Sequence, residues 1–261
     1  MSGIISVERR GRVAVITHNR PEVSNAFAYE SYGAIRDEVR ALGDDAGIGA
    51  IVITGAGKHF SAGGDIARFR QLIESGQFLS EENILYADEM VEAIRLCPKP
   101  VIAMVNGVAT GAGLSCALAC DFRVAAPSTK LIMAFVNMGL CGDTGSLYFL
   151  PKLVGIPEAC RMMMTGEPVG GQEALRTGLV SILAEEGKLE ETALAFADKL
   201  ANRSTAAIAE QKNIVNRYFY QDMKAYFADE VAAMARLSRE SDFKTAVYAF
   251  LEKKLPVFNQ G

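Results

Sequence analysis

The sequence predicts an α/β fold that is followed by a helical region. Short β-rich runs alternate with helical patterns up to about residue 188, and the β signal fades from Leu189 onward. Half of the 261 residues are hydrophobic, which is ordinary for a globular protein with a sizeable core. We therefore expect a mixed core over residues 1–188 and a helical C-terminal region over residues 189–261.

Three short apolar runs are typical of strands. Val13–Thr17 is rich in small and β-branched residues, whereas Ala50–Thr54 and Val101–Val105 are continuous apolar runs that we expect to be covered on both faces. Each of the last two runs leads through a glycine-containing turn into a loop of small residues, GAGKHFSAGGD and GVATGAGL. This repeated theme predicts stacked strand–helix units in one core.

Helical spacing is clear in two parts of the chain. An amphipathic helix that ends near Gly43 is predicted by apolar residues at spacings of three and four, namely Tyr32, Ile35, Val39 and Leu42. The C-terminal region is rich in Ala, Met, Phe and Tyr, and its pattern predicts helices over 189–201, 205–220, 222–239 and 242–254. Apolar surface on such helices is typical of packing on a core or on another subunit.

Composition and charge exclude several classes of protein. The net charge is −4 without a basic patch, so we expect no nucleic-acid partner. No apolar stretch is long enough for a transmembrane helix, and the segment before Pro21 lacks the order of a signal peptide, so we expect no membrane association. The five cysteines are odd in number and form no CxxC pair, which favours reduced thiols in a cytoplasmic protein. His18 and His59 are far apart, so we expect no metal site.

The two small-residue loops are candidates for binding a ligand close to the backbone. They are His59–Asp65 and Asn106–Gly113, and the second opens a predicted helix whose free N–H groups favour negative charge. N–H groups from two such loops can form an oxyanion hole. Close packing alone would also explain one glycine-rich loop, and neither loop has the spacing of a nucleotide-binding motif.

Several segments together resemble the crotonase, or enoyl-CoA hydratase/isomerase, superfamily. They are KPVIAMVNGVATGAGLSCALACD, HFSAGGDI, the early pairs Arg20-Pro21 and Asn25-Ala26, and the terminal FLEKKLPVF. The resemblance covers essentially the whole chain. It implies a spiral of ββα units with a C-terminal helical region that forms trimers or hexamers. It also implies an acyl-CoA substrate, with coenzyme A as part of the substrate and no separate cofactor.

The resemblance also implies a set of site residues. The oxyanion donors would be the backbone N–H groups of Gly64 and Ala112, although the family usually has glycine at the second position. The path of coenzyme A would be lined by residues around Ser24, Ala62, Asp65 and Ile66.

The acid/base positions depart from those of the family's hydratases. Where those enzymes carry two glutamates, this sequence has Ser115 and Phe135, which we expect to line the substrate site; hydration should therefore be weak. Asp143 falls where isomerases and a dehalogenase of the superfamily keep a working aspartate. Without the resemblance, Asp143 would be interpreted as a helix N-cap, and Asp88 as a solvated surface carboxylate.

The resulting hypothesis is an enoyl-CoA isomerase-like enzyme in which Asp143 is the acid/base. A hydrolytic aryl-CoA dehalogenase with Asp143 as nucleophile is one alternative, although that branch uses Trp and His where this chain has Phe135 and Asp88. Enoyl-CoA hydratase activity is another alternative. A non-catalytic homologue that binds acyl-CoA or RNA is an alternative of a different class.

Overall fold

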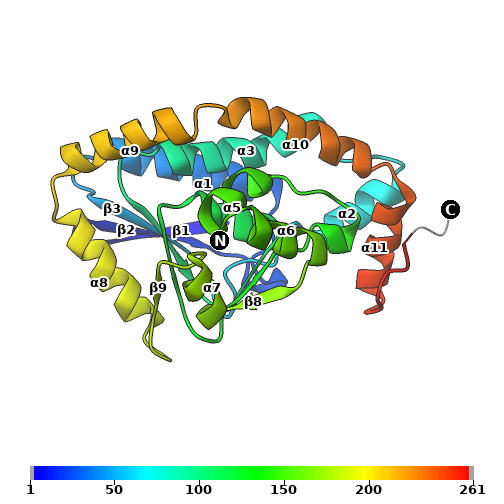
Figure 1. The fold of residues 1–261 in the computed structure, drawn as a ribbon, viewed down its shortest axis with the longest axis horizontal. Coiled ribbons are helices and arrows are strands. Elements are labelled where there is room, and N and C mark those ends of the chain that lie inside the picture. The colour runs from blue at the N-terminus through cyan, green and yellow to red at the C-terminus, as the bar shows by residue number, and fades with distance from the viewer. Residues whose placement is uncertain (1–2, 259–261) are drawn as a thin grey trace.

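The main sheet has six strands. The structure, a computed structural model, describes residues 3–258 (Figure 1). The strand order is β1-β2-β3-β4-β6-β9, in which only β1 runs antiparallel to its neighbour. The strands are β1 (Ile5–Arg10), β2 (Val13–His18), β3 (Ala50–Gly55), β4 (Val101–Val105), β6 (Phe122–Ala125) and β9 (Ile182–Leu183). Every residue of β3 and β4 is buried, as the continuous apolar runs predict.

The two faces of this sheet pack into separate apolar clusters. In β2, Ala14 and Ile16 face the larger cluster, whereas Val13 and Val15 face the smaller one, which is the alternation that a strand imposes. The smaller cluster is closed by α8 (Leu189–Ala201), the first helix of the C-terminal region. The helix packs against the sheet through three fully buried residues, Ala193, Ala197 and Ala201. Small side chains at these positions allow the helix to approach the sheet closely.

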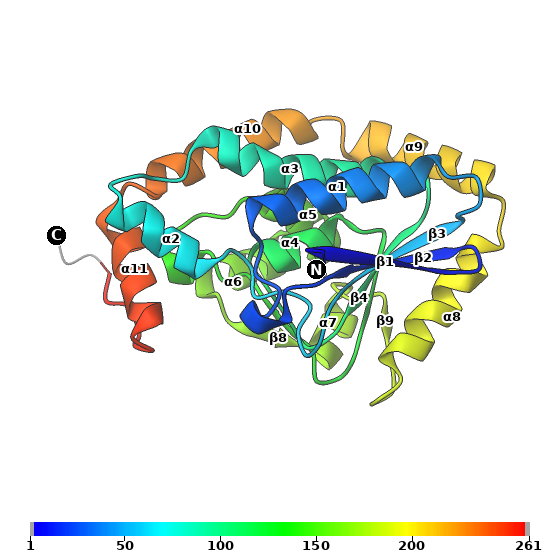
Figure 2. The same ribbon diagram turned by 180° about the vertical axis from the view of Figure 1, so that it is seen from behind.

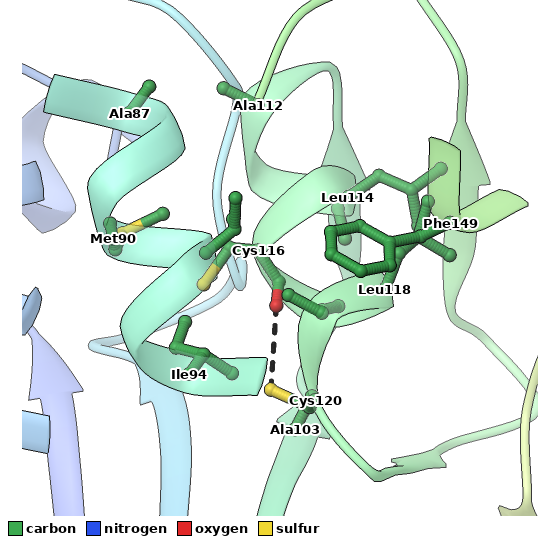
Figure 3. Close-up of a cluster of buried hydrophobic side chains, with 14 of the residues drawn as sticks. Ala87, Met90, Ile94, Ala103, Ala112, Leu114, Cys116, Leu118, Cys120 and Phe149 are labelled. Atoms are coloured by element: carbon green, nitrogen blue, oxygen red, sulfur yellow. Dashed lines mark hydrogen bonds between the residues drawn. The ribbon is translucent and has the colours of Figure 1, made fainter. Parts of the chain in front are cut away.

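The other face of the sheet is covered by helices from both halves of the chain. α1 (Tyr29–Asp44) and α4 (Ala112–Ala119) contact the strands, and α3 (Glu81–Leu96) packs against both of these helices. Figure 3 shows how α3 and α4 pack through Met90, Ile94 and Leu118, with a hydrogen bond of 3.4 Å from the Cys120 thiol to the Cys116 carbonyl. Three of the five cysteines are buried, and all five are free thiols.

Two of the three remaining C-terminal helices lie against this layer, and the last one lies at one end of the molecule (Figures 1 and 2). They are α9 (Thr205–Phe219), α10 (Met223–Leu237) and α11 (Ser241–Leu251). α9 and α10 contact α3, and α11 contacts α2 (Ile66–Glu74). The bounds of all four C-terminal helices agree with the sequence prediction to within three residues.

A second, three-stranded sheet carries one of the small-residue loops. It has the order β5-β7-β8, with β5 (Val108–Thr110), β7 (Lys130–Ile132) and β8 (Pro168–Gly170). Short helices η1 (Pro21–Val23), η2 (Val136–Met138), α5 (Ser146–Val154), α6 (Ile156–Thr165) and α7 (Gly171–Thr177) complete the described chain. None of the helices within residues 3–258 is long and apolar enough to cross a membrane.

Candidate active site

A cavity of about 630 Å³ lies between the two small-residue loops and the C-terminal helices. Its walls come from residues far apart in the sequence, including Tyr32 on α1, Ala87 on α3, Met234 on α10 and Phe250 on α11. Most of the lining side chains are apolar, with a few polar groups among them. A largely apolar cavity with a few polar groups is the usual form of a small-molecule site.

The first loop packs so closely against its neighbours that there is no room for a side chain at its glycines. Gly63 has φ of +85°, and a Cβ there would lie 2.8 Å from the Thr110 carbonyl oxygen. The Gly63 carbonyl accepts the N–H of Phe27 at 2.7 Å. The next residue, Gly64, lines the cavity. No acceptor among residues 3–258 takes the Gly64 N–H.

The second loop lies directly against the first. Ser61 and Ala109 form a β-bridge, and a Cβ at Gly113 would lie 2.6 Å from the Ser61 Cβ. Gly111 supplies the unusual backbone angles at the start of α4, with φ of +51° and ψ of −128°. Ala112 is thus the first helical residue. Its φ is not positive, so alanine is unstrained there, and its N–H is one of those that a helix start leaves without a partner.

Asp143 lies on the same cavity in a turn of unusual backbone conformation. Gly142, Thr144 and Gly145 all have positive φ, at +129°, +58° and +70°. The Thr144 hydroxyl donates to Asp143 Oδ1 at 2.7 Å. Burial nonetheless raises the pKa of Asp143 to about 6, and the Thr144 hydrogen bond only partly opposes this. Asp143 is therefore a carboxylate at neutral pH, and a stronger base than an exposed aspartate.

The interpretation of Asp143 as a helix cap is wrong. α5 begins at Ser146 and its N-cap is Gly145. The carboxyl group at this helix start belongs to Glu230 on α10, whose oxygens accept the N–H groups of Gly145 and Leu147, both at 2.9 Å. Sequence reasoning missed Glu230. The available signal was a glutamate at a buried position of the stripe formed by Phe227, Val231 and Met234.

Asp88 is not a solvated surface carboxylate either. Its side chain is only 3% exposed, and neither carboxyl oxygen has a hydrogen-bond partner within the described part of the chain. Burial, together with the charges of Asp143 and Glu230, raises its pKa to about 9. Burial and the charge of Asp143 likewise raise the pKa of Glu230 to about 8. The charge of Asp143 thus helps to keep both Asp88 and Glu230 protonated at neutral pH.

Most of the other residues singled out from the sequence also line the cavity. Ala62, Asp65, Ile66 and Phe135 do so. Asp65 is already engaged, since its Oδ2 pairs with Arg20 at 3.1 Å and its Oδ1 accepts the Ala67 N–H at the start of α2.

Two of the singled-out residues lie away from the cavity lining. Ser24 ends η1, and its carbonyl accepts the N–H of Ala62 at 2.9 Å. Ser115 is completely buried, and its hydroxyl donates to the carbonyls of Gly111 at 3.1 Å and Asp143 at 3.4 Å. Ser115 therefore links the second loop to the Asp143 turn through hydrogen bonds on the side away from the cavity.

This arrangement defines a class of site. Two backbone N–H groups on touching loops can polarise a carbonyl oxygen, and a carboxylate on the same apolar wall can move a proton. Within residues 3–258, no group of three or more His, Cys, Asp or Glu side chains is arranged to hold a metal ion.

Comparisons with known proteins give the family. Residues 8–261 match the family described as Enoyl-CoA hydratase/isomerase. The chain is 32% identical over 253 residues to short-chain-enoyl-CoA hydratase of Clostridium acetobutylicum, covering 96% of this chain and 95% of that one. It is 32% identical over 247 residues to trans-2-decenoyl-(acyl-carrier-protein) isomerase of Streptococcus mutans serotype c, covering 94% of each.

A solved structure agrees with these matches. The crystal structure of an enoyl-CoA hydratase from Mycobacterium avium subsp. paratuberculosis K-10 superimposes with a TM-score of 0.89 at 28% identity, covering 99% of both chains. The chain therefore belongs to the enoyl-CoA hydratase/isomerase family of the crotonase superfamily.

Proposed function

We propose that this enzyme shifts the double bond of enoyl-CoA thioesters, with Asp143 as the only acid/base. The observation that carries the proposal is the set of carboxyls on the cavity. Among the described lining residues only Asp65 and Asp143 carry one, and Asp65 is engaged with Arg20 and the start of α2. A single free carboxylate suits a reaction that removes a proton and returns it.

The oxyanion hole would be formed by the N–H groups of Gly64 and Ala112. The substrate thioester oxygen accepts both hydrogen bonds, and these strengthen as the oxygen gains negative charge. Each such donor contributes about 10²–10³ in rate in acyl-transfer enzymes. Both donors belong to the backbone, so they need no reorganisation during the reaction.

Asp143 would then move one proton between two carbons. Its carboxylate removes a proton from the acyl chain, and the electron pair delocalises onto the thioester oxygen as a dienolate. The protonated Asp143 returns that proton to a carbon two positions away, which leaves the double bond shifted and the carboxylate regenerated. A pKa near 6 favours both transfers, because the group is ionised at rest yet basic enough to take a proton.

Hydration is the second candidate, because one relative is named a short-chain-enoyl-CoA hydratase. Paired carboxylates would be needed to activate water and protonate the chain. At the two corresponding positions, however, this chain has Ser115, which is sealed from the cavity, and Phe135, which is apolar. We therefore propose that hydration is the minor activity.

One assay separates these activities. Wild-type enzyme is given a 3-enoyl-CoA, and formation of the conjugated 2-enoyl-CoA is followed; crotonyl-CoA is given in parallel, and loss of conjugation is followed. We expect isomerisation to exceed hydration by at least about 100-fold in kcat/KM, the lower share of general acid/base catalysis. The opposite ratio would overturn the proposal.

A further inference from the structure

Tyr32 is the one member of its helical stripe that belongs to the buried apolar cluster and also lines the cavity. Ile35, Val39 and Leu42 of α1 pack in the same cluster but do not reach the cavity. Its ring stacks on that of Phe27, with centroids 4.7 Å apart and planes inclined by 11°. This stacking fixes the ring and therefore the position of its hydroxyl.

The Tyr32 hydroxyl has no hydrogen-bond partner among residues 3–258, although the residue is only 7% exposed. The hydroxyl oxygen itself is not sealed from solvent, so its hydrogen bond is open to water or to a ligand in the cavity. Burial and the charge of Asp143 raise the pKa of Tyr32 well above its usual value. The hydroxyl therefore keeps its proton and is available as a donor on the cavity wall.

Asp143 is not the partner of this hydroxyl. The described hydrogen bond to the Asp143 side chain comes from Thr144, to Oδ1 at 2.7 Å. Tyr32 and Asp143 instead line the same cavity from α1 and from the turn before α5. An acyl chain placed for proton transfer at Asp143 would thus run past a fixed phenol.

We propose that Tyr32 is a specificity-determining residue, and that the acyl group of the preferred substrates carries an oxygen that accepts its hydrogen bond. This inference rests on the proposed function, which places the acyl chain in the cavity. A hydroxyl, carbonyl or ether oxygen on the acyl chain has the matching chemistry. A wholly hydrocarbon chain leaves the phenol unpaired, and a site built to pair with an oxygen discriminates strongly against a ligand that lacks it.

Binding tests this inference without depending on turnover. Calorimetry compares hexanoyl-CoA with a panel of hexanoyl-CoA thioesters that carry one hydroxyl, at carbon 3, 4, 5 or 6. We expect wild type to bind at least one hydroxylated chain about 10-fold or more tightly than hexanoyl-CoA. Tyr32→Phe keeps the ring and removes the donor, so it should lose this preference while its affinity for hexanoyl-CoA changes less than about twofold.

Tyr248→Phe is the matched control, because Tyr248 is also partly buried and lies outside the described cavity lining. It should retain the wild-type preference. The inference is overturned if wild type prefers none of the hydroxylated chains, a result that does not depend on any variant folding, or if folded Tyr32→Phe keeps the preference. An enzyme that binds these thioesters but shifts no double bond would overturn the proposed function and leave the Tyr32 inference standing.

Discussion

A carboxyl oxygen of Glu230 on α10 accepts a hydrogen bond of 2.9 Å from the backbone N–H of Gly145, two residues after Asp143. Its second oxygen takes the N–H of Leu147 at the same distance. The C-terminal region thus fixes the start of α5 and, through it, the turn that carries Asp143.

Glu230→Gln should weaken this support. A glutamine offers one carbonyl oxygen where the glutamate offers two acceptors, so one of the two N–H groups loses its partner. We expect kcat to fall about 10-fold or more because misplacement of a catalytic group is costly, with KM changed less than threefold. At pH 4, where Glu230 is mostly protonated in both the folded and the unfolded chain, loss of a cap of about 1 kcal/mol should lower the melting temperature by about 2–4 °C.

Asp229→Asn is the control for this variant, since Asp229 is an exposed carboxylate on the same helix. It should match wild type in kcat and in melting temperature. Glu230→Gln with full kcat would show that the turn keeps its geometry without the second hydrogen bond.

Asp143→Asn should remove catalysis and leave the fold intact. The amide keeps the shape of the side chain but cannot take a proton, so we expect kcat for 3-enoyl-CoA isomerisation to fall by about 10²–10⁴. Asp143→Ala should be as stable as Asp143→Asn to within about 0.5 kcal/mol, because Glu230 rather than Asp143 serves the start of α5. Steady-state kinetics and urea unfolding measure the two effects. Near-native turnover in Asp143→Asn would mean that another residue is the catalytic base.

The sequence predicts the scaffold better than it predicts the surroundings of this aspartate. Continuous apolar runs and helical spacing locate β3, β4 and the C-terminal helices, because these patterns depend only on residues that are close together in the sequence. The roles of Glu230 and Asp88 depend on contacts between segments far apart in the chain. A carboxylate in a helical pattern is usually solvated, and only the packing of α3, α5 and α10 reveals that these two are buried.

Activity and stability should respond to pH in opposite directions. Asp143 must be ionised to act as a base, so kcat/KM should rise with pH through about 6 and then level off. The folded-state pKa of Asp143 is raised above its ordinary value of 3.8, so between pH 4 and 6 the folded state holds a proton that the unfolded chain has lost. Its contribution to stability is therefore present at low pH and declines as the pH rises through that window. A pH–rate profile and urea unfolding at matched pH values measure both trends.

Asp88→Asn should stabilise the protein at alkaline pH. Asp88 is buried, and its raised pKa of about 9 means that folding holds it neutral while the unfolded chain ionises it. An asparagine is neutral in both states, so the variant should gain at least about 1 kcal/mol relative to wild type at pH 8 and gain nothing at pH 3. Denaturant unfolding at the two pH values supplies the comparison. A variant that is less stable at pH 8 would mean that the Asp88 carboxylate is needed in its charged form.

The family resemblance implies a trimer or hexamer, and the exposed apolar side chains of α9 support self-association. On this helix Ile214 is 54% exposed, Tyr218 is 69% exposed and Phe219 is 65% exposed. Contiguous apolar surface of this kind is typical of a protein–protein contact. Light scattering at micromolar concentration should give the mass of three or six chains, each of 28.1 kDa. A stable monomer would contradict the expectation.

Ala112→Pro offers the cleanest removal of an oxyanion donor. Ala112 is the first residue of α4, a position where proline fits a helix and where the N–H has no helical partner to lose. The substitution therefore deletes the N–H proposed to bind the thioester oxygen while keeping the helix. We expect kcat to fall by about 10²–10³ with a melting temperature close to that of wild type. Ala112→Gly keeps the N–H and is the matched control, which should retain kcat to within about threefold. Equal kcat in the proline and glycine variants would mean that the Ala112 N–H does not bind the substrate oxygen.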